Sequence, residues 1–363
     1  MNQEDIDKLL DEMVDQAEAD IDKLFAIRLK ALHERIAKLY RKYSNGGELS
    51  WTDLQKYNRF NKEMELIKQE IHNDYKQMFN NIEKLMIATY LENYLRSGFL
   101  YEFEAQQPMS YVIPSIETIR KAIANPIDKL KLPALMQDNR NEIIKKINIE
   151  ISQGIMAGEG YSTIAKRLED TVHFGAYKAR RVARTETGRA QVEARLESAE
   201  HAEKVVGKAK PRTKEETEQA EPRKGMIKTW SSSGDLEVRS SHRILDDQEA
   251  DEKGFFHFQG HKAQGPHLFH GPKSASLNIN CRCDVLFLVD GKRPKLRRFR
   301  NYEDIEYQQK LANKIDKYML EGMTEKQAEK KAKKEISPPS LVIEYQSYED
   351  WFKTLPKGSK TVV

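Results

Sequence analysis

The spacing of apolar residues changes once along this chain, and that change limits the possible folds more than any other feature. As far as about residue 201, apolar residues recur every three or four positions, as between Leu29 and Leu39, with charged residues between them. This period is typical of amphipathic helices. After Met226 short apolar runs replace it, and the run Val285–Val289 is followed by the turn pair Asp290-Gly291. The change predicts an α+β protein with a small antiparallel sheet in its second half.

Breaks in the hydrophobic pattern along the chain predict three regions. Residues 1–105 are predicted to form a long α-helical hairpin with a break at Ser44–Gly47. Its apolar stripe is thin, so we expect it to pack on a partner or on its own hairpin mate. Residues 106–290 are predicted to form a mixed α+β domain with a mobile linker at about 204–224, which is charged and lacks a hydrophobic pattern. Residues 291–363 are predicted to form a basic, helical C-terminal extension.

The sequence also predicts individual helices within these regions. Before the linker we expect a short helix from Ser162 and a separate one from about Ala176 to His201. After it we expect two to three helical turns over Leu236–Leu245, which would place Arg239 and His242 on one face. In the C-terminal extension a single helix is expected from about Tyr302 to Glu335.

Composition excludes several classes of protein. The 363 residues are 33% charged and 39% hydrophobic, with a mean hydropathy of -0.76, and they include no apolar run long enough to span a bilayer. The acidic N-terminus is unlike a secretory signal, so we expect the protein to be made and kept in a cytoplasm. The two cysteines are separated by one residue, a spacing that strains a disulfide, and they are expected to be reduced thiols.

Short motifs follow one another in a recognisable order. Arg184–Thr187 reads RTET, Trp230 lies in a short apolar run, Val238–His242 reads VRSSH, and Asn280–Cys283 reads NCRC. In this order the motifs resemble the phage head morphogenesis domain of the Mu F-like minor head proteins of tailed bacteriophages. The resemblance covers roughly residues 140–290, and it implies a virion component at or near the portal rather than a metabolic enzyme.

The resemblance also implies partners and a location. The expected partners are the phage portal protein, the major capsid or scaffolding protein, and phage double-stranded DNA, and no membrane is expected. The N-terminal helices would dock on portal or capsid protein. The protein would be made in the cytoplasm of the host bacterium and would reside in the virion, in the capsid interior or at the portal vertex. There it would act in head assembly, or in handling and delivery of the packaged genome, by binding rather than catalysis.

The same resemblance singles out a set of polar residues that would join the helical half to the strand half as one buried network. The set is Arg184, Thr185, Glu186, Arg239, His242, Asn280, Cys281, Arg282 and Cys283. The alternative is a solvated helix face, on which Glu186 can meet Arg189 three residues later but cannot face Arg184. No catalytic role is assigned to these residues.

Histidines and thiols gather after the linker and raise a second possibility. The candidate metal ligands are His242, His257, His261, Cys281 and Cys283. Cys-x-Cys in a strand places both thiols on one face, but structural zinc sites usually contain a C-x-x-C knuckle, which this sequence lacks. We therefore expect no cofactor and keep zinc as an alternative. The rival function is a DNA-processing or other hydrolytic enzyme that uses these Arg, Glu, His and Cys residues, with or without zinc.

A basic stretch follows the predicted buried strand. Between Gly291 and Arg300 there are six cations and no carboxylate: Lys292, Arg293, Lys295, Arg297, Arg298 and Arg300. The net charge of +4 is too small for general attraction to nucleic acid, so DNA binding would depend on this local cluster. The alternative is a solvated loop between domains. A second basic run, Lys326–Lys334, alternates with glutamates and is expected to be an ordinary charged helix face.

Overall fold

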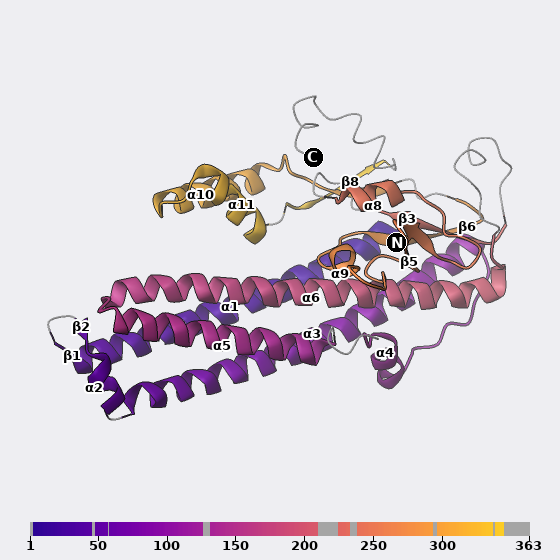
Figure 1. The fold of residues 1–363 in the computed structure, drawn as a ribbon. Coiled ribbons are helices and arrows are strands. Elements are labelled where there is room, and N and C mark those ends of the chain that lie inside the picture. The colour runs from indigo at the N-terminus through magenta and orange to yellow at the C-terminus, as the bar shows by residue number, and fades with distance from the viewer. Residues whose placement is uncertain are drawn as a thin grey trace. The chain divides into compact units, whose positions relative to one another are not determined.

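The computed structural model describes residues 3–45, 48–56, 58–125, 131–209, 224–232, 238–292, 296–336 and 338–344. Its helices are α1 (Gln3–Tyr43), α2 (Trp51–Lys56), α3 (Arg59–Ala105), α4 (Ile116–Ala122), α5 (Leu132–Met156), α6 (Tyr161–Val206), α8 (Ser240–Leu245), α9 (Ala275–Asn278), α10 (Ile305–Leu320) and α11 (Glu325–Glu335). Its strands are β1 (Ser44–Asn45), β2 (Glu48–Leu49), β3 (Met226–Ser231), β4 (Phe256–Phe258), β5 (His261–Ala263), β6 (Asp284–Val289), β7 (Leu296–Arg300) and β8 (Ser340–Glu344). The strands pair two by two and antiparallel, as β1-β2, β3-β6, β4-β5 and β7-β8. Figure 1 shows the long N-terminal helices and the short strands, and the predicted α+β class is confirmed.

The chain forms two compact units, each built from several segments. Unit 1 comprises residues 1–8, 96–111 and 195–363, and unit 2 comprises residues 9–95 and 112–194. The sequence-based boundaries after residues 105 and 290 stay a prediction, as does the mobility of the linker, of which residues 210–223 lie outside the described residues. None of the described helices is long and apolar enough to cross a membrane.

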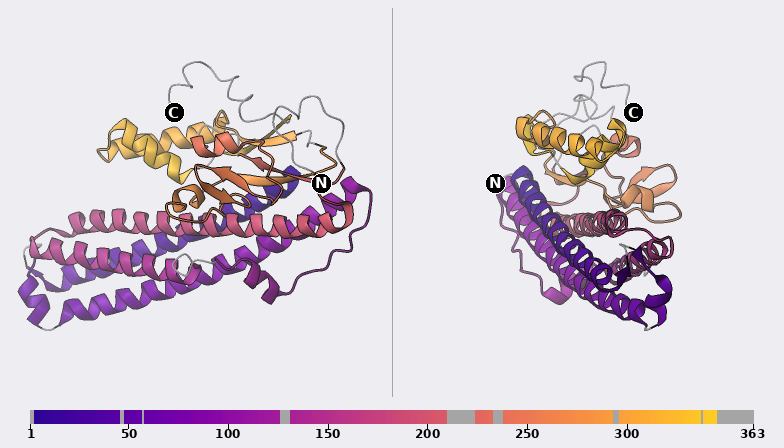
Figure 2. Two further views of the ribbon diagram at one scale, coloured as in Figure 1. Left: turned by 45° about the vertical axis from the view of Figure 1, so that its right-hand side comes forward. Right: turned by 90° about the vertical axis from the view of Figure 1, so that its left-hand side faces the viewer.

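Unit 2 is made mainly of α1, α3, α5 and α6, which run side by side in both orientations of the ribbon (Figure 2). The apolar stripes of α1 and α3 are buried, with Leu32, Ile36 and Ile67 at most 1% exposed. Arg28 on α1 pairs with Asp74 on α3 at 2.6 Å. The N-terminal helices therefore pack on each other as a hairpin, which was one of the two outcomes expected for their thin apolar stripe.

Helix α6 corrects one helix prediction. The two helices expected from Ser162 and Ala176 are one continuous helix of 46 residues. The expected break coincides with Gly175, which is a close-packing position rather than a helix end. A Cβ atom added to Gly175 would lie 2.5 Å from the Cδ1 atom of Ile143 on α5. The glycine is therefore explained by close packing against α5, and the helix continues through it.

In unit 1 the sheet formed by β3 and β6 carries the core. Met226 pairs with Val289 and Trp230 with Val285, in a continuous register. Both strands are mostly buried, as the apolar run Val285–Val289 predicted. Trp230 is completely buried and contacts the rings of Phe256 and Phe269, whose centroids lie 5.2 and 5.9 Å from its own. The strand prediction is thus confirmed.

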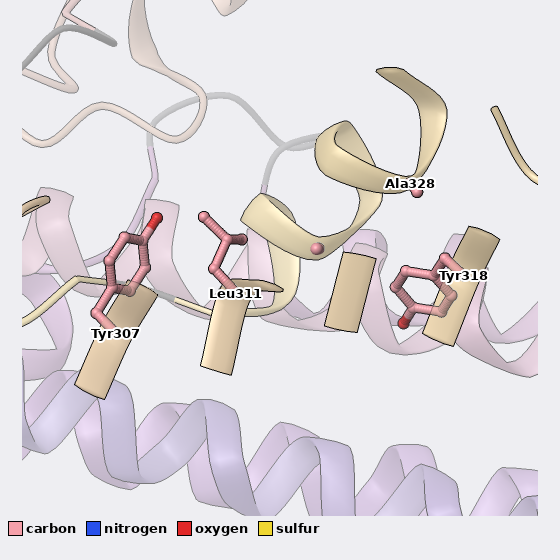
Figure 3. Packing of buried hydrophobic residues seen from close by; sticks show 5 residues of the cluster. Tyr307, Leu311, Tyr318 and Ala328 are labelled. Atoms are coloured by element: carbon pink, nitrogen blue, oxygen red, sulfur yellow. The ribbon is translucent and has the colours of Figure 1, made fainter. Parts of the chain in front are cut away.

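The C-terminal helices correct a second prediction. The single helix expected from Tyr302 to Glu335 is divided into α10 and α11 because the chain turns at Gly322, whose φ of +91° favours glycine. The two helices pack through the cluster of Tyr307, Leu311, Tyr318 and Ala328 shown in Figure 3. The segment that follows pairs back on the basic stretch as β8 on β7.

Candidate functional site

A histidine and both cysteines of the chain meet in unit 1. His242 lies on the short helix α8, Cys281 follows α9, and Cys283 immediately precedes β6. Asn280 adopts a left-handed backbone conformation with φ 54°, which turns the chain between α9 and the thiols. Asparagine tolerates this conformation better than most residues. The local sequence therefore delivers two thiols, two positions apart, to the beginning of a buried strand.

The three side chains converge on one point. The Nδ1 atom of His242 lies 3.3 Å from the Sγ atom of Cys281 and 3.3 Å from the Sγ atom of Cys283. The three candidate ligand atoms all lie within 4.8 Å of one another. The exposed fractions of His242, Cys281 and Cys283 are 1%, 4% and 6%. We call this group the His-Cys cluster. Within the part of the chain that the structure describes, it is the group of such residues close enough to hold a metal ion.

Aromatic rings form the wall around the His-Cys cluster. The imidazole of His242 meets the ring of Trp230 edge to face, with centroids 5.4 Å apart, and stacks against Phe269 at 6.3 Å. The Nε2 atom of His242 is buried and has no hydrogen-bond partner among the described residues. The orientation of the imidazole is therefore set by ring packing, and this leaves Nδ1 facing the two sulfurs.

The two thiols differ in acidity because of their surroundings. Burial raises the pKa of Cys281, but hydrogen bonding from the side chain and amide of Cys283, with the charges of Arg239 and Arg282, outweighs burial and lowers it below the usual value. Burial and the neighbouring Cys281 raise the pKa of Cys283 well above its usual value. One thiol of the pair therefore ionises much more readily than the other.

Arg239 supports the cluster from its edge. It is the N-cap residue of α8, because the helix begins at Ser240 rather than at Leu236 as expected, and residues 233–237 lie outside the described residues. Its guanidinium donates a hydrogen bond to the carbonyl of Ile279, just before the turn that leads to Cys281. Arg239 thus links the start of α8 to the thiol segment.

The RTET residues have partners of their own in unit 2. Arg184 forms two hydrogen bonds to Glu18, at 2.8 and 2.7 Å, and Thr185 donates to the carbonyl of Arg181 at 2.7 Å. Glu186 is 4% exposed and pairs with Arg189 at 3.0 Å. The i+3 pairing considered from the sequence is confirmed, but Glu186 is buried rather than solvated. One network that joins these residues to Arg239 and His242 stays a prediction.

The other candidate metal ligands lie apart from the cluster's ligand set. His257 is exposed and pairs with Asp251 at 2.7 Å, while Nδ1 of His261 lies 3.4 Å from the carbonyl oxygen of His270. Both histidines belong to the β4-β5 hairpin. Two of the five candidates are therefore excluded from the group that could hold an ion.

The basic stretch forms a strand rather than a loop. Arg297, Arg298 and Arg300 lie in β7, whose backbone pairs with β8, and Lys292 is an exposed residue before it. Arg293 and Lys295 lie outside the described residues. The second basic run behaves as expected of a charged helix face, because Lys333 pairs with Glu329 at 2.7 Å and Lys331 covers the ring of Tyr318.

Sequence reasoning missed Arg195, a completely buried charged residue of unit 1. Its side chain is completely buried and pairs with Asp7 at 2.7 Å and with Asp284, the residue after Cys283. Arg195 therefore contacts the beginning of the strand that carries the thiols. Its only sequence signal is its place among Val192, Ala194 and Ala199 on the buried side of α6.

Comparisons with known proteins support the resemblance. The profile of the family described as Phage Mu protein F like protein matches residues 145–212, which contain the RTET motif and end before the His-Cys cluster. The minor head protein GP7 of Bacillus phage SPP1 is 39% identical over 300 residues, which are 82% of this chain and 91% of that protein. The NAD(+)--arginine ADP-ribosyltransferase EFV of Enterococcus faecalis (strain ATCC 700802 / V583) is 28% identical over 203 residues, 55% of this chain but only 38% of that protein. No solved structure matches.

With a relative similar over 91% of that relative's length, this chain is a bacteriophage head morphogenesis protein. It belongs to the Mu F-like family of minor head proteins and acts in head morphogenesis. The family expected from the RTET, VRSSH and NCRC motifs is thereby confirmed.

Proposed function

We propose that this minor head protein acts by binding at the portal vertex, where it contacts the portal protein and the packaged double-stranded DNA. The observation that carries the proposal is the similarity to a minor head protein over 91% of that protein's length. Binding rather than catalysis is supported by the His-Cys cluster, whose side chains are at most 6% exposed and walled by aromatic rings. A substrate would have to displace these rings to reach either thiol.

The DNA contact is assigned to the basic stretch. The backbone of β7 is held by its pairing with β8, and a local group of cations can bind a phosphate backbone without reading sequence. The three arginines of β7 are the candidates because the pairing with β8 covers all three positions. Contacts to the major capsid or scaffolding protein remain part of the same proposal.

Replacing Arg297, Arg298 and Arg300 by Ala is expected to weaken binding to duplex DNA. Each lost phosphate contact also reduces the dependence of log K on log salt by about 0.9. Affinity would be measured by fluorescence anisotropy on two unrelated duplexes over a series of salt concentrations. Replacement of Lys330, Lys331 and Lys333 is the matched control and should have a smaller effect, because glutamates of α11 offset that helix face. A triple arginine variant that binds as tightly as the parent at low salt would remove DNA contact from the proposal.

A contact with the portal protein requires an exposed surface that is not already buried in the fold. The stripes of α1 and α3 are buried inside unit 2, so they are not free for a partner. The same unit exposes Val112, Ile113 and Ile116, with exposed fractions of 72%, 70% and 58%. Adjacent exposed apolar residues are typical of protein interaction sites.

The change of Val112, Ile113 and Ile116 to Ser is expected to reduce copurification with coexpressed portal protein while the chain stays folded. These side chains are exposed, so they can contribute contact area with the portal protein but are not part of the hydrophobic core. The readout is the portal-to-chain ratio after affinity capture and gel filtration. Leu320→Ser is the control, since Leu320 on α10 is 90% exposed but lies on another unit. Equal recovery of portal by the triple variant and the control would place the contact elsewhere.

A further inference from the structure

The His-Cys cluster brings three atoms that can act as metal ligands within 4.8 Å of one another, and all three belong to buried side chains. The Nδ1 atom of His242, which has a single lone pair, lies 3.3 Å from each sulfur. The amide of Cys283 donates to the sulfur of Cys281 at 3.4 Å. The side chain of Cys283 also hydrogen-bonds to the sulfur of Cys281, so the lone pairs of all three buried side chains face one another.

We infer that His242, Cys281 and Cys283 bind one zinc ion through Nδ1 and the two Sγ atoms. Zinc–sulfur bonds of about 2.3 Å and a zinc–nitrogen bond of about 2.0 Å place sulfur and nitrogen about 3.6 Å apart in a tetrahedron, and two sulfurs about 3.8 Å apart. The three atoms lie within 4.8 Å of one another, and each sulfur lies 3.3 Å from Nδ1. Entry of an ion requires only small side-chain shifts. Both thiols release their protons to solvent, and a water molecule completes the tetrahedron.

The donor set selects the class of metal. Two thiolates and an imidazole suit zinc, whereas calcium and magnesium require oxygen ligands. The cysteines are free thiols, so both sulfurs are available as ligands. The two thiolates also neutralise the charge of a divalent ion, which allows the complex to remain in an apolar site next to Trp230 and Phe269.

The position of the site indicates a structural role for the ion. His242 and Cys281 are separated by 39 positions, and the intervening chain has the short β4-β5 hairpin and α9 as its only named helix or strand elements. A metal ion bound by α8 and by the residues at the beginning of β6 would hold both ends of this long segment together. The free energy of binding then adds to the stability of unit 1.

The test uses the full chain without a histidine tag, purified with its thiols reduced and loaded with zinc. After gel filtration, elemental analysis is expected to give about one zinc ion per chain. A cobalt(II)-loaded sample should show thiolate-to-cobalt charge-transfer absorption in the near ultraviolet. Cys281→Ser, Cys283→Ser and His242→Gln should each weaken zinc binding by about tenfold or more. His257→Ala and His261→Ala, in the β4-β5 hairpin outside the ligand set, should bind zinc as the parent does.

A variant that fails to fold would also lose its metal, so zinc retention by the unaltered chain is the decisive measurement. If the loaded parent retains no zinc after gel filtration, the inference is wrong. A cobalt complex without the charge-transfer band would show that the thiols are not ligands and would overturn it equally. Loss of zinc from the His257→Ala variant to the same degree as from Cys281→Ser would move the site away from the cluster.

Discussion

Arg195→Met is expected to lower the free energy of unfolding by about 3–5 kcal/mol. The guanidinium of Arg195 is completely buried, pairs with Asp7 and Asp284, and donates to the carbonyl of Val285 at 3.2 Å. Burial by itself lowers the pKa of Arg195, but the two carboxylates outweigh burial and raise it, so the group stays charged. Methionine keeps much of the volume and removes the cation. The two carboxylates, each 24% exposed, would then face each other without it.

Urea unfolding of the full chain would measure this loss. Lys204→Ala is the control, since Lys204 is an exposed cation on the same helix and its removal should change the unfolding midpoint little. Adding Asp7→Asn and Asp284→Asn to Arg195→Met should recover part of the loss, because the uncompensated charges are removed. If Arg195→Met unfolds at the same urea concentration as Lys204→Ala, the buried ion pairs do not stabilise unit 1.

The helices and the central strand could be predicted because their signals are local. A stripe at three- and four-residue spacing indicates a helix from its own sequence alone, and five apolar residues before a turn pair indicate a buried strand. The predictions failed where a glycine has two possible roles. Gly175 packs closely inside one helix, whereas Gly322 separates two, and the difference lies in what each glycine touches.

The candidate site could be predicted in part for the same reason. Cys281 and Cys283 are two positions apart, so a strand-like segment places both on one side. The choice of His242 over His257 and His261 depends on contacts about 40 positions away in the sequence. His242 lies beside the thiols because β3 pairs with β6 and because the histidine ring packs on Trp230. A single sequence gives no measure of such contacts.

Which charged residues become buried could not be predicted from the sequence. Helix α6 carries many charged residues, and three of them are buried: Arg195, Glu186 and Arg189. Others, such as Arg184, are partly exposed and form ion pairs, and residue type alone does not distinguish the two groups. Burial of an ion pair depends on which helix covers that face, which is a property of the assembled unit. The RTET motif pointed to Glu186, but only through resemblance to a family.

Glu186→Ala is expected to destabilise unit 2 by about 3–5 kcal/mol. Glu186 and Arg189 keep only 5% of their side chains exposed, and their closest atoms are 3.0 Å apart. Burial raises the pKa of Glu186, although the charge of Arg189 opposes it. The guanidinium of Arg189 also donates to the carbonyl of Ile123. Removing Glu186 therefore leaves a buried cation that keeps a carbonyl partner but loses its carboxylate.

The chain offers a matched control for this prediction on the same helix. Asp170 is exposed, so Asp170→Ala should not reduce the urea midpoint. Glu186→Gln should fall between the two, because the amide oxygen can still accept from Arg189 but brings no charge. Combining Glu186→Leu with Arg189→Met should recover much of the loss, since the pair is then replaced by apolar groups of similar volume. Equal midpoints for Glu186→Ala and Asp170→Ala would mean that the buried pair contributes nothing to unit 2, and that the RTET glutamate is retained for a reason other than stability.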